Sequence, residues 1–460
     1  STILLSDTSN SNWLTINHNI TNIDCLGIPG GFSQCDDCDI CDGGNIDMDD
    51  CGICFGNNID IDCNGLCFGT SYFDECGICD ASPENDNSLC SGCTDVNAEN
   101  YDLNAIFDDG SCVYSNNIFY VPEDYITIQD AIDFSNNGDT IVVSPGIYHE
   151  NINFLSKSIF VRSTYMDDTE LNQFVISGVD SVSVVTIENI ANGGSALEGF
   201  TITQGYGKGV SFDDFISLAS DEILFDSLIT NTIRGGGISV INSSPNLKDL
   251  HIYNNVSRNV GGGIALVNSN SVIESVIVAN NSIPDGDALG GGGIAINGGN
   301  PHLIDIIISS NTVGSNMYYL NGGGGIFCGF SFGQNNIEVN IENSIIMNNS
   351  ANIGAGLGVL SGSINILRSL FIQNTGNFGS SISMGEPLGL VVGDINLNMI
   401  NSTVSSNNGN MSIAMTNSAN FQAVNSIFWN NSDIEFSPLP NNNELNIDIS
   451  YSIVSEQFSG

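Results

Sequence analysis

A glycine-rich phrase that recurs every 26 to 32 residues constrains the fold of this chain more than any other feature. The sequence reads RGGGISVIN from Arg234, GGGIALVN from Gly261, GGGIAING from Gly291 and GGGIFCGF from Gly323, and a looser AGLGVL begins at Ala355. A repeat of this length indicates stacked units, each of which buries its apolar face against its neighbours. The glycines predict a turn into a strand, where positive φ and close approach between rungs are needed.

Alternate residues of the phrase form columns, as expected for strands. One column contains Ile238, Ile264, Ile294, Ile326, Leu357, Ile382 and Ile413, and the column two residues later contains Val240, Leu266, Ile296, Cys328, Val359, Met384 and Met415. We expect both columns to face the interior, with Cys328 as a buried free thiol. The residues between them, such as Ser239 and Ala265, are mostly small. We expect these to face outward as a flat surface that another chain could pack against.

A second strand motif ends in asparagine, as in LKDLHIYNN, IESVIVANN and VNSIFWNN. Stacked asparagine side chains can hydrogen-bond from rung to rung. We therefore predict an asparagine ladder formed by Asn254, Asn280, Asn311, Asn349, Asn374, Asn407 and Asn431. N-glycosylation is the alternative role, because several sequons occur, including the one that begins at Asn280.

The start of the repeat region resembles a known family. The stretch IFYVPEDYITIQDAIDFSNNGDTIVVSPGIYHENINF from Ile118, and LEGFTITQG from Leu197, are similar to phrases of the pectin-lyase-like superfamily. The matching residues are Ile128, Ala131, Ile132, Gly138, Asp139, Thr140, Ile141, Pro145, Gly146, Tyr148, Glu150 and Asn151. The resemblance covers residues 118–455 and implies an all-β, right-handed parallel β-helix that opens with a capping helix. Roughly a dozen coils at about 4.8 Å per rung would make a rod of about 60 Å.

A segment rich in Cys and Asp precedes the β-helix. Thirteen of the 14 cysteines lie between Cys25 and Cys112, and residues 1–117 contain 21 Asp and Glu but no Lys or Arg. We therefore divide the chain into an N-terminal segment (1–24) with two short apolar runs that could pair as strands, a Cys/Asp-rich domain (25–117) and the β-helix (118–460).

The Cys-rich units, such as DDCGICFG and DECGICD, allow either zinc–thiolate sites or disulfides. We favour disulfides, because the segment holds too few apolar residues for a core. The candidates are Cys25, Cys35, Cys38, Cys41, Cys51, Cys54, Cys63, Cys67, Cys76, Cys79, Cys90, Cys93 and Cys112. Since their number is odd, one is free or bridges to another chain.

The carboxylates of this segment have no cation beside them in the sequence. Hard oxygen ligands on short loops that contain Gly and Asn suit calcium, although the spacing is not that of an EF-hand. The candidate ligands are Asp36, Asp37, Asp39, Asp42, Asp47, Asp49, Asp50, Asp60, Asp62, Asp74, Asp80, Asp95, Asp108 and Asp109. The alternative is a solvated acidic surface. We expect an irregular, disulfide-rich domain with calcium as its cofactor.

A second resemblance closes the segment. The stretch GCTDVNAENYDLNAIFDDGSCVY from Gly92 to Tyr114 is similar to a module of secreted proteins of Bacteroidota-type marine bacteria, and the preceding DCxGxC units resemble the Cys repeats that accompany it. The resemblance covers about residues 35–114. It implies secretion and a role as a spacer or in surface display. No signal peptide is visible at Ser1, so we expect export followed by cleavage, or a chain that starts mid-protein.

Charge and sequence limit the possible partners. The net charge of −45 argues against nucleic acid and, without bridging cations, against anionic membranes and polysaccharides. No apolar stretch is long enough to span a membrane. We assign no catalytic residue: Asp213 and Asp214, near Lys208, form the best acidic pair but fall in an irregular insertion, and the acids after Arg234 are sparse. His149, His251 and His302 fall on unrelated rungs.

We therefore expect a secreted structural or adhesive protein of the cell surface or extracellular matrix, which could be a self-assembling filament subunit. Its expected partners are copies of itself or a surface polysaccharide. A polysaccharide lyase or glycoside hydrolase, which the pectin-lyase-like resemblance would imply, is the alternative, and a passive carbohydrate-binding module is a third possibility.

Overall fold

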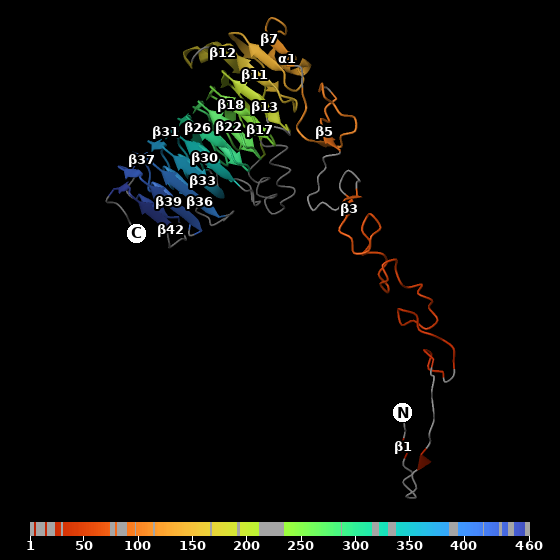
Figure 1. The fold of residues 1–460 in the computed structure, drawn as a ribbon. Helices are drawn as coiled ribbons and strands as arrows, with labels where there is room; N and C mark the ends of the chain where they lie inside the picture. Colours follow the sequence, from red (N-terminus) through yellow and green to blue (C-terminus); the bar gives the residue numbers. More distant parts are fainter. Residues whose placement is uncertain are drawn as a thin grey trace. The chain divides into compact units, whose positions relative to one another are not determined.

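The computed structural model describes residues 4–5, 14–15, 24–28, 31–73, 79–80, 90–96, 98–113, 116–165, 168–190, 194–210, 234–286, 288–314, 322–329, 337–385, 394–416, 418–431, 435–439 and 446–455. The chain divides into two units. The first consists of residues 1–96 and 100–112, and the second of residues 97–99 and 113–460. Figure 1 shows the elements of both units. Among the described residues, no helix is both long and apolar enough to cross a membrane.

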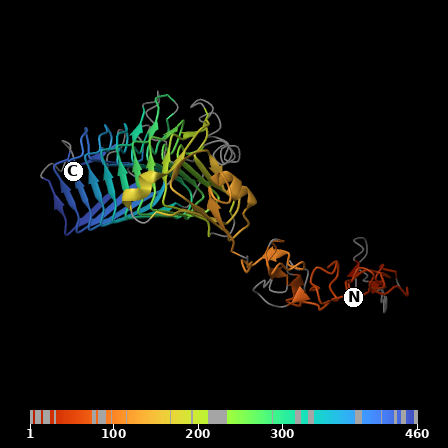
Figure 2. The ribbon, with the colours of Figure 1, turned by 90° about the horizontal axis from the view of Figure 1, so that it is seen from above.

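The second unit is a right-handed parallel β-helix, as predicted, in which every strand pairs with its counterparts in the neighbouring coils (Figures 1 and 2). Its 12-stranded sheet consists of β7 (Ile118–Val121), β8 (Thr140–Val143), β11 (Phe160–Ser163), β14 (Ala196–Glu198), β18 (Asn246–Lys248), β22 (Val272–Glu274), β26 (His302–Ile304), β30 (Glu338–Glu342), β33 (Gly362–Leu367), β36 (Ile395–Ile400), β39 (Ala419–Val424) and β42 (Asn446–Ser450). Its 11-stranded sheet consists of β9 (Gly146–His149), β12 (Phe174–Ser177), β15 (Thr201–Thr203), β19 (His251–Tyr253), β23 (Ile277–Ala279), β27 (Ile307–Ser309), β31 (Ile345–Met347), β34 (Leu370–Ile372), β37 (Thr403–Ser405), β40 (Ile427–Trp429) and β43 (Ile453–Val454).

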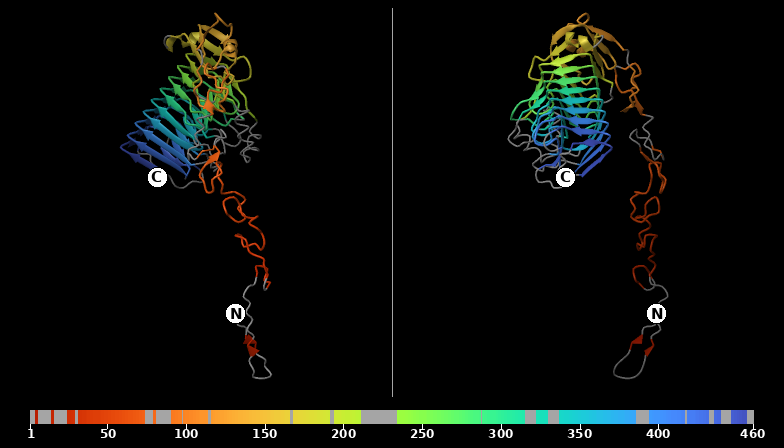
Figure 3. Two further views of the ribbon diagram at one scale, coloured as in Figure 1. Left: turned by 45° about the vertical axis from the view of Figure 1, so that its right-hand side comes forward. Right: turned by 90° about the vertical axis from the view of Figure 1, so that its left-hand side faces the viewer.

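The glycine-rich phrases belong to a third sheet. This 10-stranded sheet consists of β10 (Ile152–Asn153), β13 (Val185–Glu188), β17 (Ile238–Ile241), β21 (Ile264–Val267), β25 (Ile294–Asn297), β29 (Ile326–Cys328), β32 (Leu357–Val359), β35 (Ile382–Met384), β38 (Ile413–Met415) and β41 (Phe436–Pro438). A four-stranded sheet of β16 (Tyr206–Gly207), β20 (Val256–Ser257), β24 (Ser282–Ile283) and β28 (Thr312–Val313) completes the middle coils. Figure 3 shows the stacked rungs in two further views.

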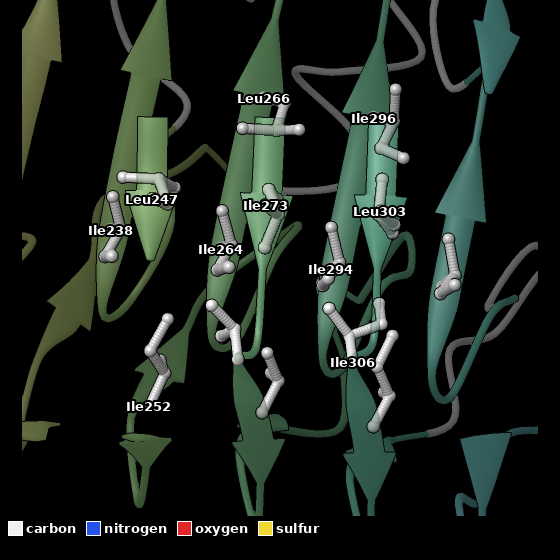
Figure 4. Packing of buried hydrophobic residues seen from close by; sticks show 14 of the residues in the cluster. Ile238, Leu247, Ile252, Ile264, Leu266, Ile273, Ile294, Ile296, Leu303 and Ile306 are labelled. Carbon is white, nitrogen blue, oxygen red and sulfur yellow. The ribbon is translucent and has the colours of Figure 1, made fainter. Parts of the chain in front are cut away.

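The predicted interior columns are confirmed. Ile238 pairs with Ile264 and Ile264 with Ile294, in register across β17, β21 and β25. These side chains are fully buried and meet those of the 12- and 11-stranded sheets, such as Leu247 and Ile252 (Figure 4). Stacking like residues in every coil builds one continuous apolar core. Cys328 lies in this core as a free thiol, and burial raises the pKa of that thiol.

The glycines between coils are explained by the backbone of the next rung. Gly261 has φ of +61°, which L-residues rarely adopt. A Cβ on Gly263 would lie 2.8 Å from the carbonyl oxygen of Gly293, and one on Gly262 would collide with that of Gly292. The first glycine of the phrase therefore supplies the turn, and the other two allow close approach between rungs, as predicted.

The prediction of an exposed column of small residues is wrong. Ser239, Ala265, Ala295 and Phe327 lie on the other side of the strand from the core, yet each is at most 3% exposed. The glycine-rich turns lie over this side: a Cβ on Gly291 would be 2.8 Å from the Cβ of Ala295. Strands β17 to β38 of this sheet are thus buried on both faces, and this surface is not free for another chain.

A short helix covers the first coil. Helix α1 (Ile128–Phe134) begins after Thr127, whose side chain accepts a hydrogen bond from the amide of Asp130, and it buries Ile128, Ala131 and Ile132. The carboxylate of Glu150 accepts hydrogen bonds from the amides at the start of the helix, and the Lys157 ammonium donates to two carbonyls near its end. A 3₁₀ helix, η2 (Asp168–Gln173), precedes β12.

A buried asparagine ladder follows the 11-stranded sheet, but the prediction was off by one residue in two coils. The ladder contains Asn255, Asn281, Asn311, Asn349, Asn374, Asn407 and Asn431, with each Nδ2 donating to the next Oδ1 over 2.8–3.1 Å. Asn254 and Asn280 instead occupy the preceding turn, with φ of 55°. Asparagine tolerates this left-handed conformation, so the two residues of each Asn-Asn pair have different roles.

The first unit is held by interlocked disulfides. Within the described residues these are Cys25–Cys41, Cys38–Cys54, Cys51–Cys67, Cys63–Cys79 and Cys93–Cys112. The first four each span 16 residues and link the first cysteine of one unit to the second cysteine of the next. Cys90 is also disulfide-bonded, and Cys35 is an exposed free thiol. Cys76 lies outside the described residues.

The strands of the first unit are short. β1 (Leu4–Leu5) pairs antiparallel with β2 (Leu14–Thr15), so the described parts of the two N-terminal apolar runs pair with each other. β3 (Tyr72–Phe73) pairs antiparallel with β4 (Cys79–Asp80), and β5 (Ser91–Gly92) pairs parallel with β6 (Phe107–Asp108). Elsewhere in the described part of this unit, turns alternate with isolated antiparallel bridges, which pair Cys35 with Cys41, Met48 with Cys54 and Ile61 with Cys67.

Candidate functional site

The aspartate that opens each Cys-rich unit accepts hydrogen bonds from the backbone of its own unit. Oδ1 of Asp36 lies 2.9 Å from the amide nitrogens of both Cys38 and Ile40, and Oδ2 lies 3.0 Å from that of Asn45. Asp49 and Asp62 make the equivalent contacts in the following units. The bonds from the amides of Ile40, Ile53 and Leu66 are the main cause that lowers the pKa of these three carboxyls.

Glycine seven residues later makes room for each of these carboxylates. A Cβ on Gly43 or Gly56 would collide with the carboxylate of Asp36 or Asp49, respectively. The spacing of Asp and Gly is therefore a structural signal: the aspartate organises the turn and the glycine lets the chain pass close to it. These carboxylates have a role that requires no metal.

The other calcium candidates are spread along the first unit. Asp37 and Asp50 bind the carboxamides of Asn45 and Asn58, while Asp108 and Asp109 accept from nearby backbone amides. Asp39, Asp42, Asp47, Asp60 and Asp95 are distributed over separate turns and loops. Asp74 and the side chain of Asp80 lie outside what the structure describes. Within the described residues, no three His, Cys, Asp or Glu side chains are close enough to hold a metal ion. Calcium binding stays a prediction.

Of the acid–base candidates considered in the sequence, Asp213 and Asp214 lie outside the described residues. His149 and His251 lie on β9 and β19 of the 11-stranded sheet, whereas His302 lies on β26 of the 12-stranded sheet. The structure thus does not bring the three histidines together.

Sequence reasoning missed a row of charged residues on the outer side of the 12-stranded sheet. The register places Arg162 beside Glu198, Glu198 beside Lys248, and Lys248 beside Glu274, on four successive strands. Lys248 Nζ lies 3.3 Å from Oε1 of Glu274, and this contact is the main cause that raises the pKa of Lys248. Opposite charges on neighbouring strands stabilise the pairing.

A tyrosine lies at the edge of this row. The hydroxyl of Tyr165 contacts the carboxylate of Asp249 and lies 3.5 Å from Oε1 of Glu198. Gly199, with φ of +82°, lets the tyrosine ring lie close to the backbone, because a Cβ there would collide with the ring. A phenol held between two carboxylates, with Lys248 alongside, is a set of groups that can donate and accept protons.

A second charged group lies farther along the same sheet. Nε2 of His302 is 3.4 Å from Oε2 of Glu342, and the guanidinium of Arg368 also contacts the Glu342 carboxylate. Nε of Arg368 lies 2.7 Å from Oδ1 of Asn343. Three coils contribute to this contact, so it too follows from register and not from proximity in the sequence.

Beyond Glu342 the outer side of the sheet becomes a field of carboxamides. Asn398 donates to Asn365 and Asn365 to Asn340, each over 3.0 Å. In a parallel column Asn420 donates to Asn396 over 2.9 Å, and Asn446 donates to Asn420. We call the outward residues of the 12-stranded sheet from Arg162 to Asp448 the polar face, and its part from β30 to β42 the amide half.

The amide half contains a hollow of about 400 Å³. Its lining consists of Asn396, Asn398, Asn420, Phe421, Gln422, Asn446 and Asp448. Phe421 is fully buried and forms part of the core, so the accessible groups are five carboxamides and one carboxylate. The carboxamides can form hydrogen bonds both as donors and as acceptors without a charge of their own, whereas the carboxylate of Asp448 only accepts.

Solved structures with low sequence identity are similar to this chain. No family model and no curated protein matches the sequence. Among solved structures, pectate lyase Pel9A is similar, with 13% identity and a TM-score of 0.38, over 74% of this chain and 78% of that chain. The alginate lyase from Paenibacillus sp. str. FPU-7 has 13% identity and a TM-score of 0.34 over 71% and 96% of the two chains. Pectin methylesterase PemA from Erwinia chrysanthemi has 13% identity and a TM-score of 0.30 over 65% of this chain and 81% of that chain.

Proposed function

We propose that this is a secreted, surface-displayed β-helix that adheres to an extracellular polysaccharide through its polar face. The observation that carries the proposal is the amide half: a field of aligned carboxamides, half-buried to exposed, with a hollow of about 400 Å³, in the size range of ligand sites. An extended polymer could lie along the stack and meet the same groups in successive coils.

The first unit supports secretion and display. Disulfides persist in oxidising compartments, and this unit has little other means of holding its shape. Five disulfides within the described residues organise a segment that is rich in carboxylates and free of Lys and Arg. We propose that this unit is a covalently braced spacer, and that adhesion belongs to the β-helix.

A second candidate function is an enzyme that acts on an extracellular polysaccharide, as the similar solved structures do by name. The contact that favours it is that of the Tyr165 hydroxyl with Asp249 and Glu198, beside Lys248. In a lyase or hydrolase, such a set would move a proton at the bond that breaks. Its reaction would take place in the charged part of the polar face.

One experiment separates these functions. The full chain is incubated with a panel of soluble polysaccharides, and both retention and release of new chain ends are measured. Retention without new chain ends supports adhesion. Release that Tyr165→Phe abolishes, while retention persists, supports the enzyme. If no polysaccharide is retained or cleaved, both proposals fail.

A further inference from the structure

We propose that the amide half selects uncharged glycans, meaning polysaccharides that offer hydroxyl groups but no carboxylate or sulfate. This inference rests on the proposed function and names the substrate class of the same face. Three features of the described residues carry it: the hydrogen-bonding groups that the ladders leave unused, the composition of the hollow, and the distribution of charge.

The ladder that runs through the hollow leaves hydrogen-bonding groups of its central carboxamide available. A carboxamide has two N–H donors and two acceptor lone pairs. In the column Asn396–Asn420–Asn446, the central Asn420 donates once, to Asn396, and accepts once, from Asn446. One donor and one acceptor of Asn420 can then face outward, whereas Nδ2 of Asn365 donates to both Asn340 and Glu338. A sugar hydroxyl is both donor and acceptor, so it can complete both bonds at once, whereas a carboxylate can only accept.

The hollow concentrates these groups on adjacent rungs. Asn398 on β36 pairs with Gln422 on β39, which pairs with Asp448 on β42, and Asn396, Asn420 and Asn446 form the neighbouring column. Rungs about 4.8 Å apart repeat at a spacing close to the advance per sugar of an extended glycan chain. A chain lying across the rungs would therefore meet a similar pair of amides at each sugar.

The charge distribution disfavours an anionic ligand here. The sequence contains no Lys, Arg or His after Arg368, and Asp448 adds a carboxylate to the hollow. A uronate or sulfate group would have to lose water without gaining a cationic partner.

The test compares polymers that differ only in charge. The full chain is titrated by calorimetry in EDTA, which removes bridging cations, with a soluble uncharged glucan, mannan and galactan and with the carboxymethylated form of each. We expect at least one uncharged polymer to bind at least 10-fold more tightly than its carboxymethylated form. Asn398→Ala and Asn420→Ala, together, should weaken that binding at least 10-fold.

The matched control is Asn268→Ala, which removes a carboxamide from another outward ladder, the one with Asn242, far from the hollow in sequence. Its binding should equal that of the unmodified protein, and thermal melting of all variants verifies that they fold. Equal affinity for charged and uncharged polymers, or an affinity that the double variant leaves unchanged, would overturn this inference. Neither result would contradict the proposed adhesion. Absence of binding to every polymer overturns the proposed function itself.

Discussion

The carboxamide of Asn431 donates to the carboxylate of Glu435, with Nδ2 2.9 Å from Oε2. All the Nδ2 groups of the buried ladder point the same way along the stack, so its last member needs an acceptor that no further asparagine supplies. Glu435 is fully buried and also accepts from the Ser455 hydroxyl over 2.7 Å. At the other end, the amide of Gly205 donates to Oδ1 of Asn255 over 2.8 Å. The ladder is thus satisfied at both ends.

Glu435→Ala should lower the free energy of unfolding by about 1–3 kcal/mol, the typical cost of leaving a buried polar group without its partner. Urea unfolding followed by circular dichroism measures the change. Asp448→Ala, which removes an exposed carboxylate on the neighbouring sheet, is the control and should change stability by less than about 0.5 kcal/mol. Equal effects of the two changes would contradict the role of Glu435.

The adjacent residues Asn348 and Asn349 should respond to mutation in different ways. Asn349 is a buried ladder member. Asn349→Ala removes the acceptor of both the backbone amide and Nδ2 of Asn311, and one of two donors to Oδ1 of Asn374, so it should cost about 2–4 kcal/mol. Asn348 has φ of 56° and is exposed, so Asn348→Gly should be nearly neutral. Unfolding in urea compares the pair, and a larger loss at Asn348 would refute the assignment.

The two free thiols within the described residues should differ in reactivity. Cys35 is exposed, whereas Cys328 is buried and burial raises the pKa of its thiol. Since the thiolate is the reactive form, iodoacetamide at pH 8 should modify Cys35 in the native protein and Cys328 only after denaturation. Peptide mass spectrometry reads both sites. Cys35→Ser serves as control, and native labelling of Cys328 would be inconsistent with the core described above.

Acid should loosen the turns of the first unit. The pKa of Asp36, Asp49 and Asp62 is lowered below the ordinary value of 3.8 by backbone hydrogen bonds, of which those from Ile40, Ile53 and Leu66 are the strongest. A carboxyl whose pKa is lowered by folding stabilises the fold above pH 3.8. This stabilisation is lost as the pH falls through the pKa of the carboxyl in the folded state. The amide resonances of Ile40, Ile53 and Leu66, measured by NMR during an acid titration, should shift together below pH 3.8. In Asp49→Asn only the Ile53 response should vanish.

Calcium can be tested without reference to adhesion. If carboxylates of the first unit bind it, calorimetric titration of the metal-free chain should show heat that disappears when Asp37, Asp39, Asp47 and Asp50 are replaced by Asn. Asp36, Asp49 and Asp62 are kept, because their backbone contacts hold the turns. Light scattering with and without EDTA shows whether the ion also joins copies of the chain. A titration without heat would contradict calcium binding by the first unit.

Local patterns were enough to predict the coils and their register. The columns that begin at Ile238 and Val240 followed from strand periodicity and from a glycine phrase that restarts each coil at the same point. It was harder to predict which residue of the pair Asn254 and Asn255 belongs to the ladder. Both positions favour asparagine, the first because of its backbone conformation and the second because of its hydrogen bonds. The outward assignment of Ala265 failed because a strand of this sheet lies under its own glycine turn.

The charged row could not be found from proximity in the sequence. Glu198 and Lys248 are 50 residues apart, and only the pairing of β14 with β18 brings them together across an insertion. Aligning the coils on their outward positions, and not only on their buried ones, would have revealed the row and the carboxamide columns. The turn-forming aspartates were missed because an acidic cluster suggests a metal before it suggests hydrogen bonds to the backbone.

The staggered cysteines of the first unit also limit how far it can stretch under force. Tension applied between Cys25 and Cys79 need not follow the 54 residue steps of backbone that separate them. It can cross each disulfide and follow the backbone only from Cys41 to Cys38, from Cys54 to Cys51 and from Cys67 to Cys63. That path contains 10 residue steps, or about 35 Å of extended backbone, plus four Cα–Cα steps of 5.2–5.7 Å. Under tension this segment would therefore act as a short, nearly inextensible tether, and would not extend to the roughly 190 Å of its full backbone.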